Sequence, residues 1–449
     1  MVEPNPFGLI LTKPTVPSIV HMIFDKLRAN GVRLPYPLRA LRERQAQGDR
    51  YYFSPNMNPL LTHSYIPYGK QSISQADIDA VVSVLQSDWL TQGSAIERFE
   101  QAVTTHTGAT HGVAVNSATS ALHIACLALG LGPGDWLWTS PNTFVASANV
   151  GLYCGAQVDF VDIDPRTYNL SVESLAAKLV QAEVDQRLPK AVVPVHFAGQ
   201  SCDMAAIHQL AQRYGFAILE DASHAIGATY QGKPVGCGHF SDLTVFSFHP
   251  VKIITTGEGG MVVTHRSDLY EKLIRLRTHG ITRETHLMTE PSHGPWYYQQ
   301  LELGLNYRMT DIQAALGASQ MNRLDAFVAR RRKLATRYDA MLEGLPLTRP
   351  WQHPETQSSW HLYVVRLQLN RLSKTHRQVF EALRQAGIGV NLHYIPVHTQ
   401  PYYQAFGFQW GDFPQSEQYY REAISLPLYY GLTETDQGRV VQTLREILA

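Results

Sequence analysis

Short apolar runs alternate with helical patterns through the middle of this 449-residue chain. The runs are rich in valine, isoleucine and aromatic residues, and the segments between them place apolar residues at helical spacing. This alternation predicts an α/β fold with a doubly wound, mostly parallel sheet. The expected strands are 112–115, 136–139, 158–162, 191–195, 216–219, 243–248 and 261–264, and the expected helices include 121–129, 145–153 and 204–214.

Ligands of a doubly wound sheet bind beyond the carboxyl ends of its strands, so side chains that follow strands are candidates for a site. Asp221 follows the strand 216–219, although an isolated aspartate there is more simply a helix cap. Phe144 follows the strand 136–139 and could stack on a flat ligand, although most such phenylalanines belong to the core.

The segment Asn116–Ala121 lies between an expected strand and a buried helix. Its small residues allow backbone N–H groups to approach a phosphate at the helix N-terminus, where the helix dipole favours anions. Thr119 and Ser120 can add hydroxyl donors. Serine and threonine caps are common, so this pattern alone is a weak signal.

One lysine, Lys252, follows the run 243–248 and precedes a hairpin signal at 257–260. A lysine held between two strands is poorly placed to be a solvated surface charge. Buried lysines lose their protons readily, and a neutral amine is a nucleophile. We interpret Lys252 as the Schiff-base lysine of a pyridoxal 5′-phosphate enzyme.

That cofactor needs a partner for its pyridine nitrogen, a phosphate cradle and a surface on which its ring can stack. Asp221 could pair with the nitrogen and keep it protonated. His224 could orient Asp221 or contact the ring, although an ordinary hydrogen-bonded histidine explains it equally well. Ser247 lies five residues before Lys252 and could reach the same phosphate.

The charge balance excludes some partners. Lys+Arg and Asp+Glu both number 38, which argues against nucleic acid or an acidic membrane as the main partner. No segment is a convincing membrane span, and the nineteen histidines show no metal-ligand spacing, so no metal is expected. The four scattered cysteines fit buried thiols in a reducing cytosol and hence a cytoplasmic protein.

The chain divides into three expected parts. Residues 1–60 form an N-terminal extension of unknown role, with one possible helix near 19–28. Residues 61–315 form the large domain, in which Ser74–Asp77 is a capping-box signal for a helix. Residues 316–449 form a smaller C-terminal α+β domain. A long helical stretch expected over 311–342 crosses the boundary into this domain, whose other expected elements are strands at 360–369 and 390–393 and helices at 379–386 and 435–448.

The helix after the capping box carries an apolar face made of Ile78, Val81, Val82 and Leu85. In the C-terminal part, the basic run Arg330–Lys333 is most simply a solvated face or a subunit contact.

Six motifs together resemble the DegT/DnrJ/EryC1/StrS family of sugar-nucleotide aminotransferases, which are fold-type-I pyridoxal-phosphate enzymes. The resemblance runs from about Ile66 to the C-terminus, with the motifs in the family's order. The matching segments are 116–123, 141–144, 220–225, 247–252, 256–260 and 304–317.

The resemblance implies a role for each candidate. Lys252 would carry the cofactor, and Asp221 would pair with the pyridine nitrogen. Phosphate binding would fall to Ala118, Thr119 and Ser247, and ring stacking to Phe144. Asn306 would reach the phosphate in the neighbouring subunit, which implies a homodimer with shared active sites.

Within the family, the segments 249–252 and 391–403 are most similar to the pseudaminic-acid branch, although Ile253 replaces a proline of that branch. The similarity implies L-glutamate as amino donor and a UDP-linked 4-keto-6-deoxy-N-acetylhexosamine as acceptor. His393 and Tyr394 are candidates for contacts to the sugar or diphosphate, with a buried strand end as the equal alternative. Other 4-keto sugars, of the perosamine or 4-amino-arabinose type, remain open.

Two other functions on the same fold are disfavoured. Pyridoxamine-dependent sugar dehydratases resemble this family but carry histidine in place of the Schiff-base lysine. A non-catalytic regulator would be expected to lose Lys252 or Asp221, and both are present.

Overall fold

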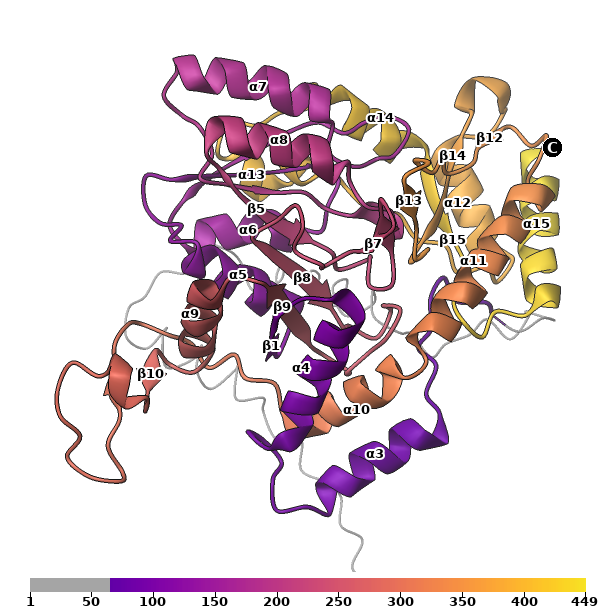
Figure 1. Ribbon diagram of the computed structural model, residues 1–449. Helices are drawn as coiled ribbons and strands as arrows, with labels where there is room; N and C mark the ends of the chain where they lie inside the picture. The colour runs from indigo at the N-terminus through magenta and orange to yellow at the C-terminus, as the bar shows by residue number, and fades with distance from the viewer. Residues whose placement is uncertain (1–64) are drawn as a thin grey trace, which may run out of the picture. The chain divides into compact units, whose positions relative to one another are not determined.

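Seven strands form the central sheet, and their alternate residues point to opposite faces. They are β1 (His111–Val115), β2 (Trp136–Thr139), β3 (Gln157–Phe160), β4 (Ala191–Val193), β5 (Ala217–Asp221), β8 (Leu243–Ser247) and β9 (Gly260–Thr264). The order is β1-β9-β8-β5-β4-β2-β3 (Figure 1). Only β9 runs opposite to the other six strands of this sheet, so the predicted mostly parallel sheet is confirmed.

This computed structural model describes residues 65–449. The extension expected over 1–60, and its possible helix near 19–28, therefore lie outside the described residues.

Helices cover both faces of the sheet. Leu137 packs in one core cluster with α5 (Ala118–Ala128), α6 (Ala146–Tyr153) and α9 (Ser267–Arg277). The next residue, Trp138, packs on the opposite face with α7 (Val172–Val184) and α8 (Met204–Tyr214). Further along that second face, α4 (Ser94–Thr107) packs against β1 and β9. This two-sided burial, worth about 1.5–3 kcal/mol for each large apolar side chain, fixes which face each strand residue takes.

The C-terminal part is built on a small antiparallel sheet of β12 (Leu347–Thr348), β14 (Tyr363–Leu367) and β15 (Ala423–Leu426). Its core also includes residues of α11 (Leu324–Met341), α12 (His376–Gln385) and α15 (Glu434–Leu448). The segment 390–393, expected as a strand, makes only an isolated bridge between Asn391 and Ser425.

The helical stretch expected over 311–342 is two helices, α10 (Asp311–Met321) and α11, with the break at 322–323. The first half of α11 buries Phe327 in the core of the large sheet, and its second half buries Tyr338 in the C-terminal core. One helix therefore contributes to both cores. The domain boundary near residue 316 stays a prediction.

The remaining elements are shorter or connect these layers. They are α3 (Gln75–Leu85), α13 (Pro401–Gln404), α14 (Pro414–Glu422), β6 (Thr229–Tyr230), β7 (Lys233–Pro234), β10 (Ile281–Thr282), β11 (Gln299–Gln300), β13 (Thr356–Gln357) and four 3₁₀ turns at 197–199, 285–287, 369–371 and 397–399. The hairpin of β10 and β11 extends away from the sheet in Figure 1.

Helix α3 begins with the predicted capping box, but most of its expected apolar face does not pack against residues 65–449. Ile78, Val82 and Leu85 are exposed. The helix docks through Val84, which is buried in the core with residues of α4 and α10, and through Asp77, which is fully buried and accepts hydrogen bonds from Gln320 (2.7 Å) and Arg323 (2.5 Å).

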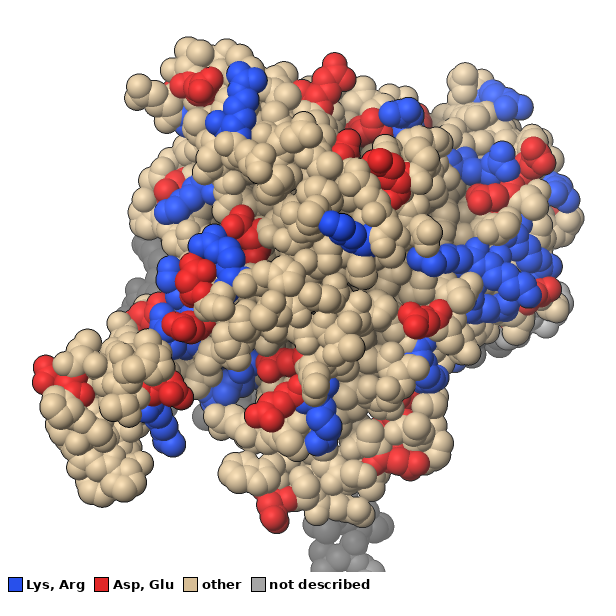
Figure 2. All heavy atoms as spheres, in the orientation of Figure 1, with Lys and Arg blue, Asp and Glu red and all other residues tan. Residues whose placement is uncertain are grey.

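The basic run at 330–333 divides between surface and interior. Figure 2 shows lysine and arginine side chains gathered over the region of α11. On that surface, Arg330 and Lys333 lie around Glu434. Arg331 is buried, and its guanidinium donates to the carbonyl oxygens of Trp360, His361 and Leu428 at 3.0–3.2 Å. The interpretation as a solvated face is therefore wrong for Arg331.

Candidate active site

Three neighbouring strands bring the expected phosphate-binding residues to one edge of the sheet. Gly260 on β9 pairs with Val115 on one side and with Ser247 on the other. A Cβ atom at Gly260 would lie 2.5 Å from the carbonyl oxygen of Ser117 and 2.6 Å from the backbone nitrogen of Ala118. Only glycine allows this approach, which seats the N-terminus of α5 against β9 and beside Ser247.

The first turn of α5 provides N–H donors without partners inside the helix. Ser117 is the N-cap, and its hydroxyl accepts the N–H of Ser120 at 3.1 Å. Ala118 and Thr119 begin the helix and are half-buried. Together with Ser247, they form a cradle suited to a phosphate. Their binding of phosphate remains a prediction.

Lys252 lies in the turn that follows β8, where its N–H donates to the carbonyl oxygen of His249 at 2.9 Å. Burial lowers the pKa of the Lys252 amine to about 8, although the negative charge of Asp221 opposes this effect. The amine is therefore substantially neutral near pH 8, as a nucleophile and proton acceptor must be.

Asp221 ends β5 and is 5% exposed. One carboxylate oxygen accepts the hydroxyl of Ser147 at 2.6 Å, and the other accepts the N–H of Ser223 at 3.1 Å. Ser147 is itself buried in α6 and lies 2.8 Å from the hydroxyl of Thr143. Sequence reasoning missed both hydroxyls. The signal was available: a serine amid the apolar residues of an expected helix just after Phe144.

A cluster of rings lies beside Lys252. Phe144 is 58% exposed, and its ring centroid is 6.3 Å from that of Tyr394. The Tyr394 hydroxyl lies 3.1 Å from Nε2 of His224. The ring of His361, a residue not predicted from the sequence, is 4.3 Å from that of His224. Nδ1 of His361 is buried and has no hydrogen-bond partner among residues 65–449.

Burial and nearby positive charge keep the histidines of this cluster neutral. Burial, Lys252 and His393 hold the pKa of His224 well below its usual value. Burial and the charge of Lys252 lower the pKa of His393 to about 3, and Nδ1 of His393 lies 2.8 Å from the hydroxyl of Ser425. His393 thus joins the same neighbourhood as Lys252.

Asn306 is set apart from this group. It is exposed, and its backbone forms a bridge with Thr278 near the hairpin of β10 and β11. Nothing in the described chain joins its side chain to Lys252. This location is compatible with the expected contribution to a second subunit, which remains a prediction.

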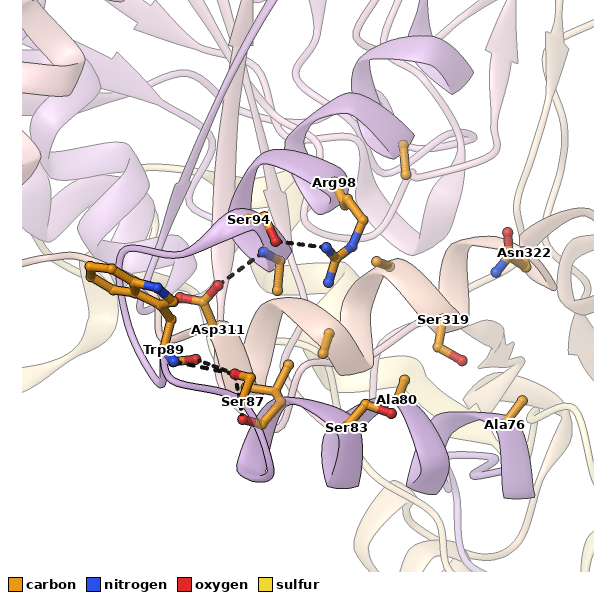
Figure 3. A pocket seen from close by; sticks show the side chains of 15 residues that line it. Ala76, Ala80, Ser83, Ser87, Trp89, Ser94, Arg98, Asp311, Ser319 and Asn322 are labelled. Atoms are coloured by element: carbon orange, nitrogen blue, oxygen red, sulfur yellow. Dashed lines mark hydrogen bonds between the residues drawn. The ribbon is translucent and has the colours of Figure 1, made fainter.

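A separate groove of about 730 Å³ lies between α3, α4 and α10 (Figure 3). Serine and alanine side chains line most of it, with Arg98 and Asp311 among them. Asp311 caps α4 by accepting the N–H groups of Gly93 (2.8 Å) and Ala95 (2.9 Å). The groove shares no residue with the group around Lys252.

Among the described residues, no set of three or more histidine, cysteine or acidic side chains is arranged to bind a metal. Within 65–449 there is also no helix with the length and apolar character needed to cross a membrane. Cys126, Cys154 and Cys202 are buried free thiols, and Cys237 is partly exposed.

The lowered pKa of Lys252 predicts how cofactor attachment depends on pH. Because only the neutral amine attacks an aldehyde, the attachment rate should rise about tenfold per pH unit up to about pH 8 and then level off. Stopped-flow absorbance of apo-protein mixed with pyridoxal phosphate measures this rate, with N-acetyl-lysine as the control amine. A midpoint near the ordinary lysine value of 10.5 would contradict the prediction.

The same shift affects the stability of the apo-protein. The pKa of Lys252 is lower in the folded protein than in the unfolded chain. Between about pH 8 and 10.5 the unfolded chain therefore binds more protons than the folded protein. The contribution of Lys252 to the free energy of unfolding should therefore rise across that window.

This chain is similar to known aminotransferases in sequence and in structure. The sequence profile described as the DegT/DnrJ/EryC1/StrS aminotransferase family matches residues 71–445. The spore coat polysaccharide biosynthesis protein SpsC of Bacillus subtilis (strain 168) is 40% identical over 387 residues, covering 86% of this chain and 97% of that protein.

Two solved structures share the fold. One is Helicobacter pylori PseC, an aminotransferase involved in the biosynthesis of pseudoaminic acid, with a TM-score of 0.78 and 30% identity over 86% of this chain and 99% of that one. The other is DesV of S. venezuelae in complex with a ketimine intermediate, with a TM-score of 0.75 and 30% identity over 86% of this chain and 98% of that one.

Proposed function

The chain belongs to the DegT/DnrJ/EryC1/StrS aminotransferase family, and from this premise we propose the reaction that it carries out. It is a pyridoxal-phosphate-dependent sugar aminotransferase of fold type I. We propose that its amino donor is L-glutamate and that its acceptor is a UDP-linked 4-keto-6-deoxy-N-acetylhexosamine. The amino group would enter at C4, giving UDP-4-amino-4,6-dideoxy-N-acetyl-β-L-altrosamine in a cytoplasmic reaction.

The pairing of Lys252 with Asp221 carries this proposal. The Lys252 amine has a pKa of about 8 and lies close enough to Asp221 for their charges to interact. When bound, pyridoxal phosphate supplies an electron sink that carries nitrogen from one substrate to the next. The buried carboxylate of Asp221 would keep the pyridine nitrogen protonated. The Lys252 amine would remove the proton from the donor's Cα in the first half-reaction and would deliver a proton to C4 of the sugar in the second.

The other residues hold the reactants. We assign the phosphate to Ala118, Thr119 and Ser247, and ring stacking to Phe144. His224 would form part of the wall of the cofactor site, where it could orient Asp221 or contact the ring. Asn306 of a second copy would complete the phosphate site in a homodimer. The sugar or its diphosphate would contact His393 and Tyr394, which lie close to His224 and Phe144.

Two observations bear on the choice of sugar. The segments 249–252 and 391–403 favour the pseudaminic-acid branch, as does the likeness to PseC of Helicobacter pylori. SpsC has the higher identity, and its name connects it with spore coat polysaccharide. A second candidate is therefore an aminotransferase for another nucleotide-linked 4-keto sugar.

Product analysis tests these assignments. The purified protein is incubated with ¹⁵N-labelled glutamate and a panel of UDP-, GDP- and dTDP-linked 4-keto sugars, and amino sugars are identified by mass spectrometry. We expect label in the UDP-linked N-acetylated product, and none with Lys252→Ala. Labelling of only a non-acetylated or dTDP-linked sugar would reject the pseudaminic-type substrate while keeping the aminotransferase. Absence of label with every sugar would reject both.

A further inference from the structure

Glu220 and Asp221 are neighbours on β5, and their side chains point to opposite faces of the sheet. Asp221 faces α6, from which the hydroxyl of Ser147 donates to it. Glu220 shares the other face with Ile218, which packs in the core beneath α7 and α8. Glu220 is only 5% exposed, and it has no part in the proposed reaction. A buried carboxylate on this face therefore needs an explanation of its own.

The Glu220 carboxylate bonds to side chains from both strands that flank β5. One oxygen lies 2.5 Å from Nε2 of His196, which follows β4. The other accepts the hydroxyl of Thr244 on β8 at 2.9 Å and also the hydroxyl of Ser241, just before that strand. Glu220 and Thr244 are direct partners in the register of β5 and β8. One carboxylate thus ties three adjacent strands together near their carboxyl ends.

His196 is completely buried, and each of its ring nitrogens has a partner. Nδ1 accepts the backbone N–H of Cys202 at 3.1 Å, so Nε2 carries the proton that is donated to Glu220. Burial opposes ionisation of Glu220, but its hydrogen bonds to His196, Ser241 and Thr244 lower the pKa of the carboxyl group. The carboxylate is therefore ionised and held by donors from two sides.

Backbone hydrogen bonds make the same connection on the side of β4. The N–H of Asp221 donates to the carbonyl oxygen of Pro194 at 2.9 Å, and the N–H of His196 donates to the carbonyl oxygen of Asp221 at 3.0 Å. On the other side of β5, β8 leads into the turn that carries Lys252. The strands that Glu220 joins are therefore those that determine where Asp221 and Lys252 lie.

Stability alone does not explain this arrangement. Removing a carboxylate from water is costly, and apolar side chains of similar volume would fill the same space without that cost. Polar contacts of fixed geometry do, however, hold neighbouring groups more precisely than apolar packing does. The spacing between Asp221 and Lys252 needs such precision, because the two groups would act on opposite parts of one bound molecule.

We propose that Glu220 is a positioning residue, which acts with His196 to fix the spacing between Asp221 and Lys252 through the strands that carry them. The inference rests on the proposed function, in which Asp221 pairs with the pyridine nitrogen of the cofactor. A carboxylate keeps that nitrogen protonated only while it stays within hydrogen-bond distance. Loosening the end of β5 should therefore weaken the effect of Asp221 without removing its charge.

The first test is the pH dependence of cofactor attachment to the apo-protein, measured by stopped-flow absorbance. Burial lowers the pKa of the Lys252 amine to about 8, and the charge of Asp221 opposes this effect. Glu220→Ala should loosen Asp221 and so lower the midpoint of attachment by about half a pH unit. The rate at which glutamate bleaches the visible band of the bound cofactor should fall about tenfold. Glu220→Gln keeps an acceptor for His196 and should recover most of both values.

A double variant separates positioning from a general weakening of the fold. Asp221→Asn already lacks the charge, so adding Glu220→Ala to it should move the midpoint no further. The matched control is Glu417→Ala, because Glu417 is also a buried carboxylate bonded to a buried histidine, His398, at 3.1 Å. It lies on α14, outside the central sheet. This control should lower the melting temperature and leave the midpoint and the bleaching rate unchanged.

Thr244→Val covers the case in which Glu220→Ala does not fold, since it removes one hydrogen bond and keeps the shape of the side chain. It should move the midpoint in the same direction by a smaller amount. Unchanged midpoints in both variants would overturn the proposal, as would effects of Glu220→Ala and Asp221→Asn that add in the double variant. Failure of glutamate to bleach the wild-type band would reject the proposed function, whereas the attachment midpoint would still decide this inference.

Discussion

Lys252→Ala should abolish transamination, lowering kcat about ten-thousandfold or more, because no other described side chain combines a primary amine with the charge of Asp221. The visible band near roughly 420 nm that marks covalently held cofactor should also be lost. The Lys252 side chain lies in a turn after β8 and makes no hydrogen bond to residues 65–449, so the melting temperature of the apo-protein should change little. Steady-state kinetics, absorbance and thermal unfolding measure the three effects.

Lys252→Arg is the matched control for this change. It keeps a positive charge near Asp221 but cannot form the covalent link, because the guanidinium stays protonated. We expect it to be as inactive as Lys252→Ala. Activity within about tenfold of wild type in either variant would disprove the assigned role of the lysine.

Asp221→Asn should lower kcat about a hundred- to thousandfold while leaving the fold intact. The amide oxygen can still accept the N–H of Ser223, and the Ser147 hydroxyl can turn toward Thr143 while accepting from the new amide. What disappears is the negative charge that would keep the pyridine nitrogen protonated. The measurement is kcat for both half-reactions together with the melting temperature.

Ser147→Ala separates the charge of Asp221 from its orientation. It removes the 2.6 Å hydrogen bond to the carboxylate and leaves the charge in place. Its effect should be about tenfold, clearly smaller than that of Asp221→Asn. Equal losses in the two variants would mean that orientation alone matters and would contradict the electrostatic role.

Much of the site could be predicted from the sequence, because ligands of such a sheet bind beyond the carboxyl ends of its strands. Asp221 and Ser247 end strands of the sheet, and Ala118 begins the helix after β1, as their positions in the sequence indicated. The underlying reason is that parallel strands end at one edge, so sequence-distant residues meet there without any other information.

Features that depend on single polar contacts could not be predicted. Periodicity identified the apolar face of α3 but not its docking through buried Asp77, because one carboxylate gives no periodic signal. His361 was missed for the same reason, since it stands alone before an apolar strand. Arg331 lies in a run of four basic residues, and the sequence does not distinguish it from the other three. The sequence pattern records which residues are apolar, whereas these contacts depend on which carbonyl or ring happens to lie opposite.

The shared helix α11 has a mechanical consequence. A hinge needs a few residues whose backbone angles can change freely, and a continuous helix with one half buried in each core provides none. Swinging the C-terminal region open would require bending or breaking that helix near buried Arg331. Admission of a substrate as large as a nucleotide sugar is therefore expected to depend on loop and side-chain movements, with the walls that carry Asp221 and His361 keeping their spacing throughout turnover.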